Sequence, residues 1–502
     1  MKRLFAKIVA VATFAAVAAL LCASAPAYAL PQVFLVQNSG WMAPFFTDPQ
    51  SQYKPLVTEL VMAATQPGDQ MVLAAFNQGL PGAPSPKALL SLTVDATATR
   101  AAVASALAQL QVAKKPGSEV LADTDLGEAL GAAIHVALAG KPGLVWLVTN
   151  NRNSPNNDQA TARRNREFYQ LIHQGGAISE ALAFPLKMPV RGTHYSANGL
   201  MVYVFAIGEE GARALDRLLA LGRIGAVITE PPARLKPLDW DTVRLLPRRV
   251  DDTPGVAFSM GPGGVLRADV APDARTPGAN IGWHLENTMY PYTIVSARVK
   301  ARSVLAGQNH PIALASDQVS ALAPGASVPL SSVMQLPVAQ LPGKWSAQAV
   351  AAAGSAVVMP GQIELRLTEQ QLALSPAFRQ RMAALFPGDP LPDIFTPPAQ
   401  LRGSVARLPI EVRVHYGVAP LLALIGAGVA LAGALGGAAL AYVRPRRTQL
   451  TVDDELRTVH TRAGVTQPVF DKAGNKVAQL KTTLFGHQLT DLREGAQVRL
   501  GR

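Results

Sequence analysis

Apolar runs of strand length alternate with segments of helical periodicity from Leu30 to about Leu221. The run GLVWLVTN (143–150) has almost no polar break, which predicts a strand buried on both faces. Alternating strands and helices predict an α/β domain with a mainly parallel sheet and helices on both faces. Strands are predicted at 33–37, within 67–78, at 143–150 and at 199–208, and helices at 53–65, 98–113, 126–138, 160–174 and 209–221.

The pattern changes after this domain. Residues 222–255 are rich in Pro and Arg without a clear period, which indicates a linker or an edge insertion. Residues 256–416 contain alternating strand patterns separated by Pro/Gly turns, which predicts a β-sandwich of immunoglobulin-like class. A helical insert is predicted at 375–386. The final stretch, 444–502, includes a predicted hairpin around Lys472–Asn475 and is expected to form a small β-unit.

The two ends predict an exported, anchored protein. Residues 1–29 have a basic start, an apolar run and small residues at Ala27 and Ala29, the layout of a secretory signal peptide. Cys22 leaves open a lipoprotein, although Leu20 and Leu21 depart from the usual lipid-attachment pattern. Cleavage after Ala29 would remove this cysteine, the only one in the chain, and with it any disulfide or thiolate metal ligand.

Residues 417–443 carry no charge and exceed the length of about 20 apolar residues that crosses a bilayer. Arg444, Arg446 and Arg447 follow at once, and basic clusters stay on the cytoplasmic side. We therefore expect a single-pass protein of a bacterial inner membrane, with residues 30–416 in the periplasm and 444–502 in the cytoplasm. Small residues spaced four apart, as at Gly433 and Gly437, leave self-association open.

Charge adds little to the functional picture. The net charge of +12 falls to +9 without Lys2, Arg3 and Lys7, and the final stretch 444–502 contributes +5. The exported body thus keeps a net charge of only +4. Most of the excess positive charge belongs to the predicted signal peptide and to the predicted cytoplasmic stretch. Nucleic-acid binding has no support in this distribution.

Polar residues follow the predicted strands at three places. The first strand ends in Gln37, Asn38, Ser39, Gly40 and Trp41, a helix begins after Thr124-Asp125, and another strand ends in Asn150-Asn151. In an open α/β sheet these ends meet at one edge, which is where ligands bind. A partner-binding site is therefore expected from Gln37, Asn38, Ser39, Trp41, Thr124, Asp125, Asn150 and Asn151.

The stretches Ser39-Gly40-Trp41-Met42 and TDLGEAL (124–130) resemble the von Willebrand factor A (vWA) domain, over about residues 30–221. In that family an Asp-x-Ser-x-Ser tip, a Thr before a LGEAL helix and a late Asp hold a divalent cation, usually Mg²⁺, which binds a partner's carboxylate. Ser39 and Thr124 match their positions. Gln37 replaces the first Asp, Trp41 the second Ser and Asn150 the late Asp.

These replacements remove both carboxylates from the resembling site. Mg²⁺ gives up its water reluctantly and usually needs one or two carboxylates. We therefore expect a degenerate site without a cofactor, in which amides and hydroxyls hydrogen-bond one another. Mg²⁺ bound by Ser39 and Thr124 with Asp123 or Asp125 as substitute ligands is the alternative, a cation-dependent adhesion module.

Trp41 leaves two interpretations open. Its ring either covers the vacated pocket and packs with Phe45 and Phe46, or anchors a partner at the binding edge. The run NNRNSPNND (150–158) is similarly either a solvated loop or a polar binding loop.

Catalytic motifs are weak. Ser39 lacks a G-x-S-x-G context, so a serine hydrolase is only a remote alternative. His135 and His173 fall in helices as packed or surface residues, and His194 has no second histidine at metal-ligand spacing. The sequence thus predicts a non-enzymatic binding or scaffold protein with an unidentified periplasmic protein partner.

Overall fold

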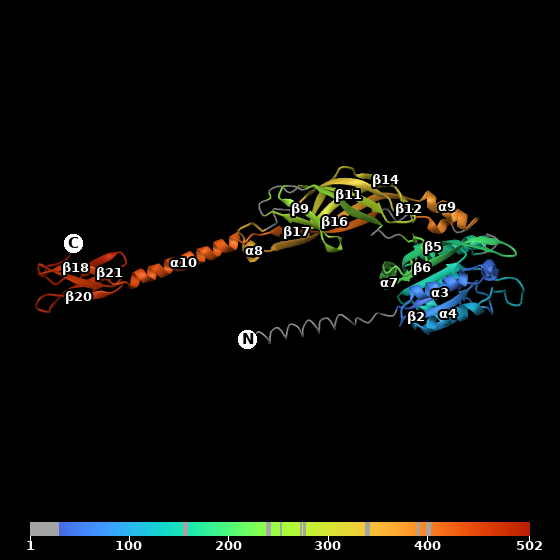
Figure 1. Ribbon diagram of the computed structural model, residues 1–502, viewed down its shortest axis with the longest axis horizontal. Helices are drawn as coiled ribbons and strands as arrows, with labels where there is room; N and C mark the ends of the chain where they lie inside the picture. Colours follow the sequence, from blue (N-terminus) through green and yellow to red (C-terminus); the bar gives the residue numbers. More distant parts are fainter. Residues whose placement is uncertain are drawn as a thin grey trace. The chain divides into compact units, whose positions relative to one another are not determined.

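The computed structural model describes residues 30–153, 159–236, 242–251, 254–271, 274, 278–336, 342–388, 392–397 and 403–501. The predicted signal peptide lies outside these residues. The chain forms two compact units, the first within 1–268, 276–337 and 359–411, and the second within 269–275, 338–358 and 412–502. Figure 1 shows the elements of both units, coloured along the sequence.

The N-terminal half of the first unit contains a seven-stranded sheet in the order β3-β2-β1-β4-β6-β5-β7. β1 pairs in parallel with β2 and with β4, as the alternating pattern predicts. The remaining pairs are antiparallel, so the sheet is mixed and the prediction of a mainly parallel sheet is wrong. The strands are β1 (Gln32–Gln37), β2 (Gln70–Phe76), β3 (Lys87–Thr93), β4 (Gly143–Thr149), β5 (Ile178–Arg191), β6 (Ser196–Ile207) and β7 (Ala233–Arg234).

One source of the antiparallel pairing is the connection between β5 and β6, and the β2–β3 pair at the other edge is a second. β5 and β6 are joined by four residues, 192–195, and a connection this short can only join antiparallel neighbours. β6 lies beside β4 and runs against it, with Thr149 opposite Met201. Both strands are buried along most of their length, so β6 reads as an unbroken apolar run from Leu200 to Ile207.

Helices cover both faces of this sheet. Tyr53 and Leu60 of α3, Val103 of α4 and Leu215 of α7 belong to one buried cluster. Leu126 of α5 and Phe168 of α6 belong to the cluster on the other face. The helices are α2 (Ala43–Thr47), α3 (Tyr53–Ala64), α4 (Ala98–Gln109), α5 (Leu126–Ala132), α6 (Gln159–His173) and α7 (Gly208–Ala220), with short turns of helix at η1 (Gly40–Met42) and η2 (Ala133–Ala137).

A helix from much later in the chain completes the second face. α9 (Pro376–Leu385) coincides with the predicted insert at 375–386, and Phe378 and Leu385 join the buried cluster of α5 and α6. Arg381 Nη2 donates to the carbonyl oxygen of Pro185 at 3.0 Å, and its guanidinium forms a 2.6 Å ion pair with Glu230. η5 (Pro392–Phe395) follows, and its Phe395 ring stacks edge-on with Phe378 at 4.9 Å.

The strands between Val243 and His415 form a ten-stranded sheet. Their order is β8-β11-β15-β13-β12-β16-β17-β10-β9, with β14 paired to β12. β13 pairs with β12 through Gln308–Ile312 and with β15 through Ala313 and Leu314, so it changes partner along its length. The strands are β8 (Val243–Asp251), β9 (Val256–Met260), β10 (Leu266–Val270), β11 (Gly278–Asn287), β12 (Tyr292–Leu305), β13 (Gln308–Leu314), β14 (Gln318–Leu322), β15 (Ser327–Gln335), β16 (Ala356–Leu374) and β17 (Ser404–His415).

Residues 222–255 supply β7 to the first sheet and β8 to the second, where β8 pairs with β11. This stretch, for which the sequence indicates a linker or an edge insertion, therefore contributes an edge strand to each sheet. Short elements elsewhere are η3 (Pro262–Gly264) and α8 (Ala347–Ala351).

The last part of the chain is helix α10 (Ala419–Val443) followed by a small β-unit. α10 is long and apolar enough to cross a membrane, and its window of highest hydropathy is fully exposed. Two three-stranded sheets, β19-β18-β23 and β20-β21-β22, share a core that includes Leu450, Val477 and Leu480. Their strands are β18 (Arg446–Val452), β19 (Glu455–Thr461), β20 (Thr466–Phe470), β21 (Lys476–Thr483), β22 (Gly486–Thr490) and β23 (Val498–Leu500).

Replacing Phe378 by alanine tests the contribution of α9. Phe378 is 2% exposed, so Phe378→Ala should lower the free energy of unfolding by about 3–5 kcal/mol in chemical denaturation. Phe470→Ala is the matched control, because Phe470 is 46% exposed and should cost less than about 1 kcal/mol. Equal losses in the two variants would show that α9 does not stabilise the sheet.

Glu180 on β5 predicts a pH dependence of stability. Burial raises the pKa of Glu180 to about 7, against the opposing charge of Arg234. The folded state therefore prefers the protonated carboxyl, and the stability it adds below the unfolded pKa is lost as pH rises through about 7. Glu180→Gln cannot titrate, so between pH 5 and pH 8 it should lose less stability than the native protein by about 2 kcal/mol. Parallel pH profiles in denaturation experiments would contradict this, with exposed Glu167→Gln as the control.

Candidate functional site

Three chain segments meet at one edge of the seven-stranded sheet. Gln37 ends β1, Thr149 ends β4, and Thr124 stands two residues before α5. β1 and β4 pair in parallel, so their ends lie at the same edge. Backbone hydrogen bonds fix the loops there, from Gly40 N to the Ala122 carbonyl at 2.8 Å and from Thr124 N to the Asn153 carbonyl at 3.0 Å.

The side-chain amide of Gln37 lies at the centre of this edge. Its Nε2 donates to Ser39 Oγ at 2.7 Å and to Thr124 Oγ1 at 2.8 Å. Its Oε1 accepts from Thr149 Oγ1 at 2.5 Å and from the Asn150 backbone N–H at 3.0 Å. Thr124 Oγ1 also donates to Ser39 Oγ at 2.6 Å. One amide thereby uses both of its donors and accepts twice.

This network is closed to solvent. Gln37, Ser39, Thr124 and Thr149 are each 0% exposed. The Gln37 amide nitrogen contacts the same two hydroxyls that the family resemblance assigns to a cation. Neutral donors and acceptors therefore satisfy one another where a charged ligand set would need an ion.

The three asparagines of the predicted site hold the surrounding loops. Asn38 is 8% exposed, and its Nδ2 donates to the Gln111 carbonyl at 3.1 Å. Asn150 Nδ2 donates to the Trp41 carbonyl at 2.9 Å. Asn151 adopts φ 66°, and its Oδ1 accepts from the Tyr203 hydroxyl. All three are buried, so they are positioned to shape the loops rather than to present polar groups to solvent.

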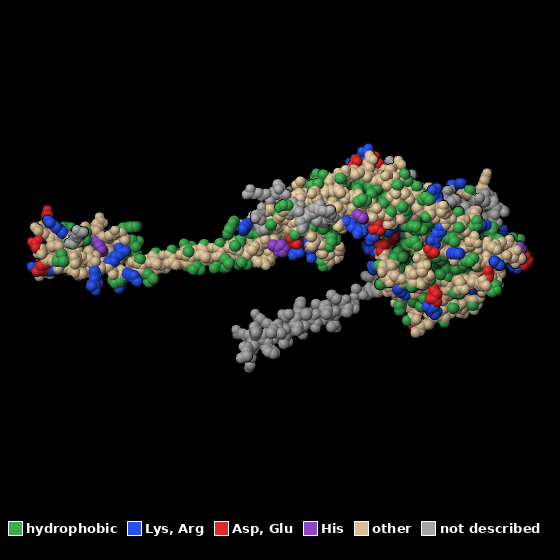
Figure 2. Space-filling model, turned by 45° about the horizontal axis from the view of Figure 1, so that its top comes forward, with side chains coloured by type: hydrophobic (Ala, Val, Ile, Leu, Met, Phe, Trp, Pro, Cys, Tyr) green, Lys and Arg blue, Asp and Glu red, His purple; other side chains and the backbone are tan. Residues whose placement is uncertain are grey.

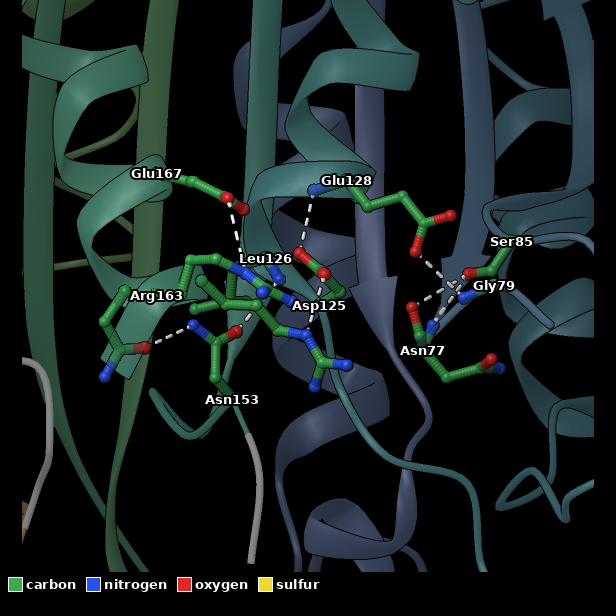
Figure 3. Close-up of polar contacts among 11 residues, drawn as sticks. Asn77, Gly79, Ser85, Asp125, Leu126, Glu128, Asn153, Arg163 and Glu167 are labelled. Atoms are coloured by element: carbon green, nitrogen blue, oxygen red, sulfur yellow. Dashed lines mark hydrogen bonds and ion pairs between the residues drawn. The ribbon is translucent and has the colours of Figure 1, made fainter. Parts of the chain in front are cut away.

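The two acidic residues beside Thr124 have other partners, and Figure 3 shows those around Asp125. Asp125 Oδ1 caps α5 by accepting from the Glu128 N–H at 2.9 Å, and its carboxylate forms a 3.3 Å ion pair with Arg164. Asn153 Oδ1 accepts from the Leu126 N–H at 3.0 Å, which completes the cap. Asp123 forms a 2.9 Å ion pair with Lys115. Within the described ranges, no three His, Cys, Asp or Glu side chains are grouped to hold a metal ion.

Trp41 does not pack with Phe45 and Phe46, as the first of its two interpretations expects. Its ring meets Tyr195 edge-on at 5.0 Å, and the Arg152 guanidinium lies 4.7 Å from its centroid. Phe45 and Phe46 instead contact the Tyr53 ring. Trp41 Nε1 is buried and finds no hydrogen-bond partner in the described part of the chain.

A cavity of about 660 Å³ opens beside Trp41 at this edge. Trp41, Pro44, Val120 and Leu121 give it apolar walls, and the Lys115–Asp123 ion pair stands at its border. Burial raises the pKa of the Tyr195 hydroxyl, which keeps this residue neutral as a wall of the cavity. A cavity of this size, mostly apolar with a few polar groups, suits a side chain or a small ligand.

Four residues of this region are absent from the site predicted from the sequence. Tyr195 and His194 line the cavity from the turn between β5 and β6, and only the polar stretch VRGTHYSANG marks that turn in the sequence. Arg152 reaches Trp41 from the loop after β4, and Thr149 immediately precedes the predicted Asn150. The alternative of a polar binding loop at 150–158 falls partly on residues 154–158, which lie outside the described residues.

The histidines in helices contribute no site. His135 is exposed on η2, and His173 is 8% exposed with its Nε2 facing the Ile394 carbonyl oxygen at 3.1 Å. Burial lowers the pKa of His173. These two residues are thus a surface residue and a packed residue, as expected from the sequence.

Comparison with known proteins identifies no family. No family model matches the chain, and no curated protein matches it. Among solved structures, the chain is similar to CfaE, the adhesive subunit of the CFA/I fimbria of enterotoxigenic Escherichia coli. The alignment has 9% identity and a TM-score of 0.13, and it covers 47% of this chain and 73% of the adhesin chain. A similarity of this size carries no argument about function.

Gln37→Leu tests whether the amide holds the edge together. The variant leaves three buried hydroxyls and the Asn150 N–H short of a partner, so the free energy of unfolding should fall by about 3 kcal/mol or more. Gln70→Leu is the control, because Gln70 is exposed and makes one side-chain bond to Thr93. Millimolar Mg²⁺ should leave the melting temperature of the native protein unchanged. Equal stability of the two variants, or a rise in melting temperature with Mg²⁺, would contradict the closed network.

Proposed function

We propose that this chain is a membrane-anchored, non-enzymatic binding protein whose vWA-like head holds a protein partner without a metal ion. The Gln37 amide carries the proposal, since it fills with neutral hydrogen bonds the place where the family resemblance expects a cation. A closed site of this kind cannot recruit a partner through a shared ion. In this proposal the partner binds the surface beside the closed site, where Trp41 and the cavity lie.

The architecture supports the vWA resemblance only in its core. The parallel strands β2, β1 and β4, with Ser39 and Thr124 at one edge, agree with it. The antiparallel β6 next to β4 departs from a purely parallel arrangement. The ten-stranded sheet that follows, with β13 exchanging partners between β12 and β15, supports an immunoglobulin-like sandwich as a stalk for this head.

The chemistry of the cavity favours an apolar group on the partner. Its walls are mostly apolar, and Val120 stands at its border with 57% of its surface exposed. Trp and Tyr side chains beside a cavity are typical anchors of protein interfaces. Arg152 over the Trp41 ring adds a positive charge next to this apolar surface. An apolar side chain with a neighbouring acceptor or carboxylate would match both features.

The two alternative functions have less support. Asp123 forms an ion pair with Lys115, and Asp125 pairs with Arg164 and caps α5. A cation would have to displace these contacts before it could bind either carboxylate. Ser39 is 0% exposed and hydrogen-bonded to Gln37 and Thr124, which leaves its hydroxyl without access to a substrate. A cation-dependent module and a serine hydrolase are therefore not favoured.

The anchor in this proposal is α10. Its length, apolar composition and exposed surface suit a bilayer, and Arg444, Arg446 and Arg447 follow at its end. Together with the signal peptide expected at 1–29, these features support the proposal of a head in the periplasm of a bacterial inner membrane and a final β-unit in the cytoplasm.

Photo-crosslinking in intact cells tests the proposed binding surface. A photo-reactive amino acid at Val120 should capture one discrete protein. The same residue at Val136, which is 77% exposed on η2 at the far end of the α5 segment, should not capture it. Ala43→Arg, which extends a charged side chain from the cavity wall, should abolish the product at Val120. Equal capture at both positions, or a product that survives Ala43→Arg, would refute the cavity as the binding surface.

A further inference from the structure

One end of the β-unit that follows α10 lies beside the end of the helix, because only two residues connect them. β18 begins at Arg446, three residues after α10 ends, and Arg446 pairs with Thr461 at the end of β19. β20 pairs Thr466 with Lys481, and β21 pairs Thr483 with Gly486. The loops 462–465 and 484–485 therefore lie at the same end as Arg446. We call this the helix-proximal end.

Two contacts connect these loops to the helix terminus. Arg446 Nη1 donates to the Leu484 carbonyl oxygen at 3.2 Å. The Tyr442 ring from the last turn of α10 packs so closely on Gly464 that a Cβ at this position would clash with its hydroxyl. Gly464 also has φ +80°, so glycine suits both the turn and the contact. The two loops thus lie at the level where the apolar helix ends.

Apolar side chains are exposed on these loops. Phe485 is 99% exposed, Leu484 is 49% exposed and Val465 is 41% exposed. A phenylalanine fully in solvent at a hairpin tip contributes nothing to the core of the β-unit. Large apolar side chains exposed next to a spanning helix are typical of segments that enter the interface of a bilayer.

The net positive charge of the β-unit is concentrated at the helix-proximal end. Five cations belong to the helix-proximal end or the segment leading to it: Arg444, Arg446, Arg447, Arg462 and Lys481. No acidic residue lies there among the described residues. The acids all lie toward the opposite end, where Asp453 and Asp454 form the β18–β19 turn. They are Asp453, Asp454, Glu455, Asp471, Asp491 and Glu494. The basic residues at that end nearly balance the acids, and three of them form ion pairs with Glu455 and Asp491. They are Arg457, Lys472, Lys476, Arg493 and Arg499.

We infer that the helix-proximal end of the β-unit rests on the anionic surface of the bilayer that α10 spans. Phe485, Leu484 and Val465 enter the boundary between headgroups and acyl chains, while the surrounding arginines and Lys481 face anionic phospholipid headgroups. The opposite end, which holds the acids and is close to neutral, points away from the negatively charged surface. This inference rests on α10 being a membrane span, as proposed above, and adds a lipid partner for the β-unit.

An environment-sensitive fluorophore on the full-length protein in lipid nanodiscs tests this. With Cys22→Ala, the label is placed at Phe485→Cys, at Ala473→Cys in the β20–β21 turn of the opposite end, or at Leu431→Cys in the middle of α10. Discs contain either phosphatidylcholine alone or phosphatidylcholine with phosphatidylglycerol, and quencher-bearing acyl chains report contact with the membrane. The label at 485 should be quenched at least about two-fold more in anionic than in neutral discs, and the label at 473 should stay solvent-exposed in both.

The three label positions distinguish a failure of the proposed docking from a failure of the proposed membrane span. Quenching at 431 without quenching at 485 would overturn the docking of the β-unit while leaving the membrane span intact. No quenching at 431 would overturn the span itself. Equal quenching at 485 in neutral and anionic discs would overturn the role assigned to the arginine cluster.

Discussion

One primary amide organises the edge of the seven-stranded sheet. Gln37 joins the end of β1 to the loop before α5 through Thr124 and to the end of β4 through Thr149 and the Asn150 backbone. An amide is suited to this position because it donates and accepts at once, whereas a carboxylate only accepts. A carboxylate here could only accept, and the Ser39 and Thr124 oxygens would lose the two hydrogen bonds that the amide nitrogen donates. Among the three replaced positions, Gln37 is the one whose amide connects both Ser39 and Thr124 to the end of β4.

The strands and helices that follow a clean local period were predictable. Unbroken apolar runs mark β1, β4 and the second half of β6, and the amphipathic period marks α3, α4 and α6 within a few residues. β5 has no counterpart among the predicted elements, because Pro185 and Pro189 interrupt its pattern. Proline removes a ladder donor and lowers strand propensity, yet β5 tolerates both in a pairing with register shifts. β3, which pairs antiparallel with β2, is likewise missing from the predicted strands, and without β3 and β5 the sheet looks more parallel in sequence than it is.

The chain positions that form the candidate site were predictable from the sequence, whereas the residues that form the surface around it were not. Strand ends locate Gln37, Thr124 and Asn150, because parallel pairing brings such ends together. Local sequence cannot show that Asp125 pairs with Arg164, or that Arg152 and Tyr195 enclose Trp41. These contacts join elements whose relative positions depend on the whole sheet. The charged and aromatic residues around the cavity therefore emerge only from the fold.

The seating of α9 on the first sheet has a consequence for the order of folding. Arg152 donates to the carbonyl of Pro387, 235 residues further along the chain, and His173 meets Ile394 across a similar separation. Contacts this distant form late, since a long loop must close before they add stability. A chain that emerges amino-terminus first would hold the apolar face around Phe168 uncovered until residues 376–395 arrive. That face stays exposed, and can associate wrongly, for as long as the ribosome needs to synthesise the residues between Phe168 and α9.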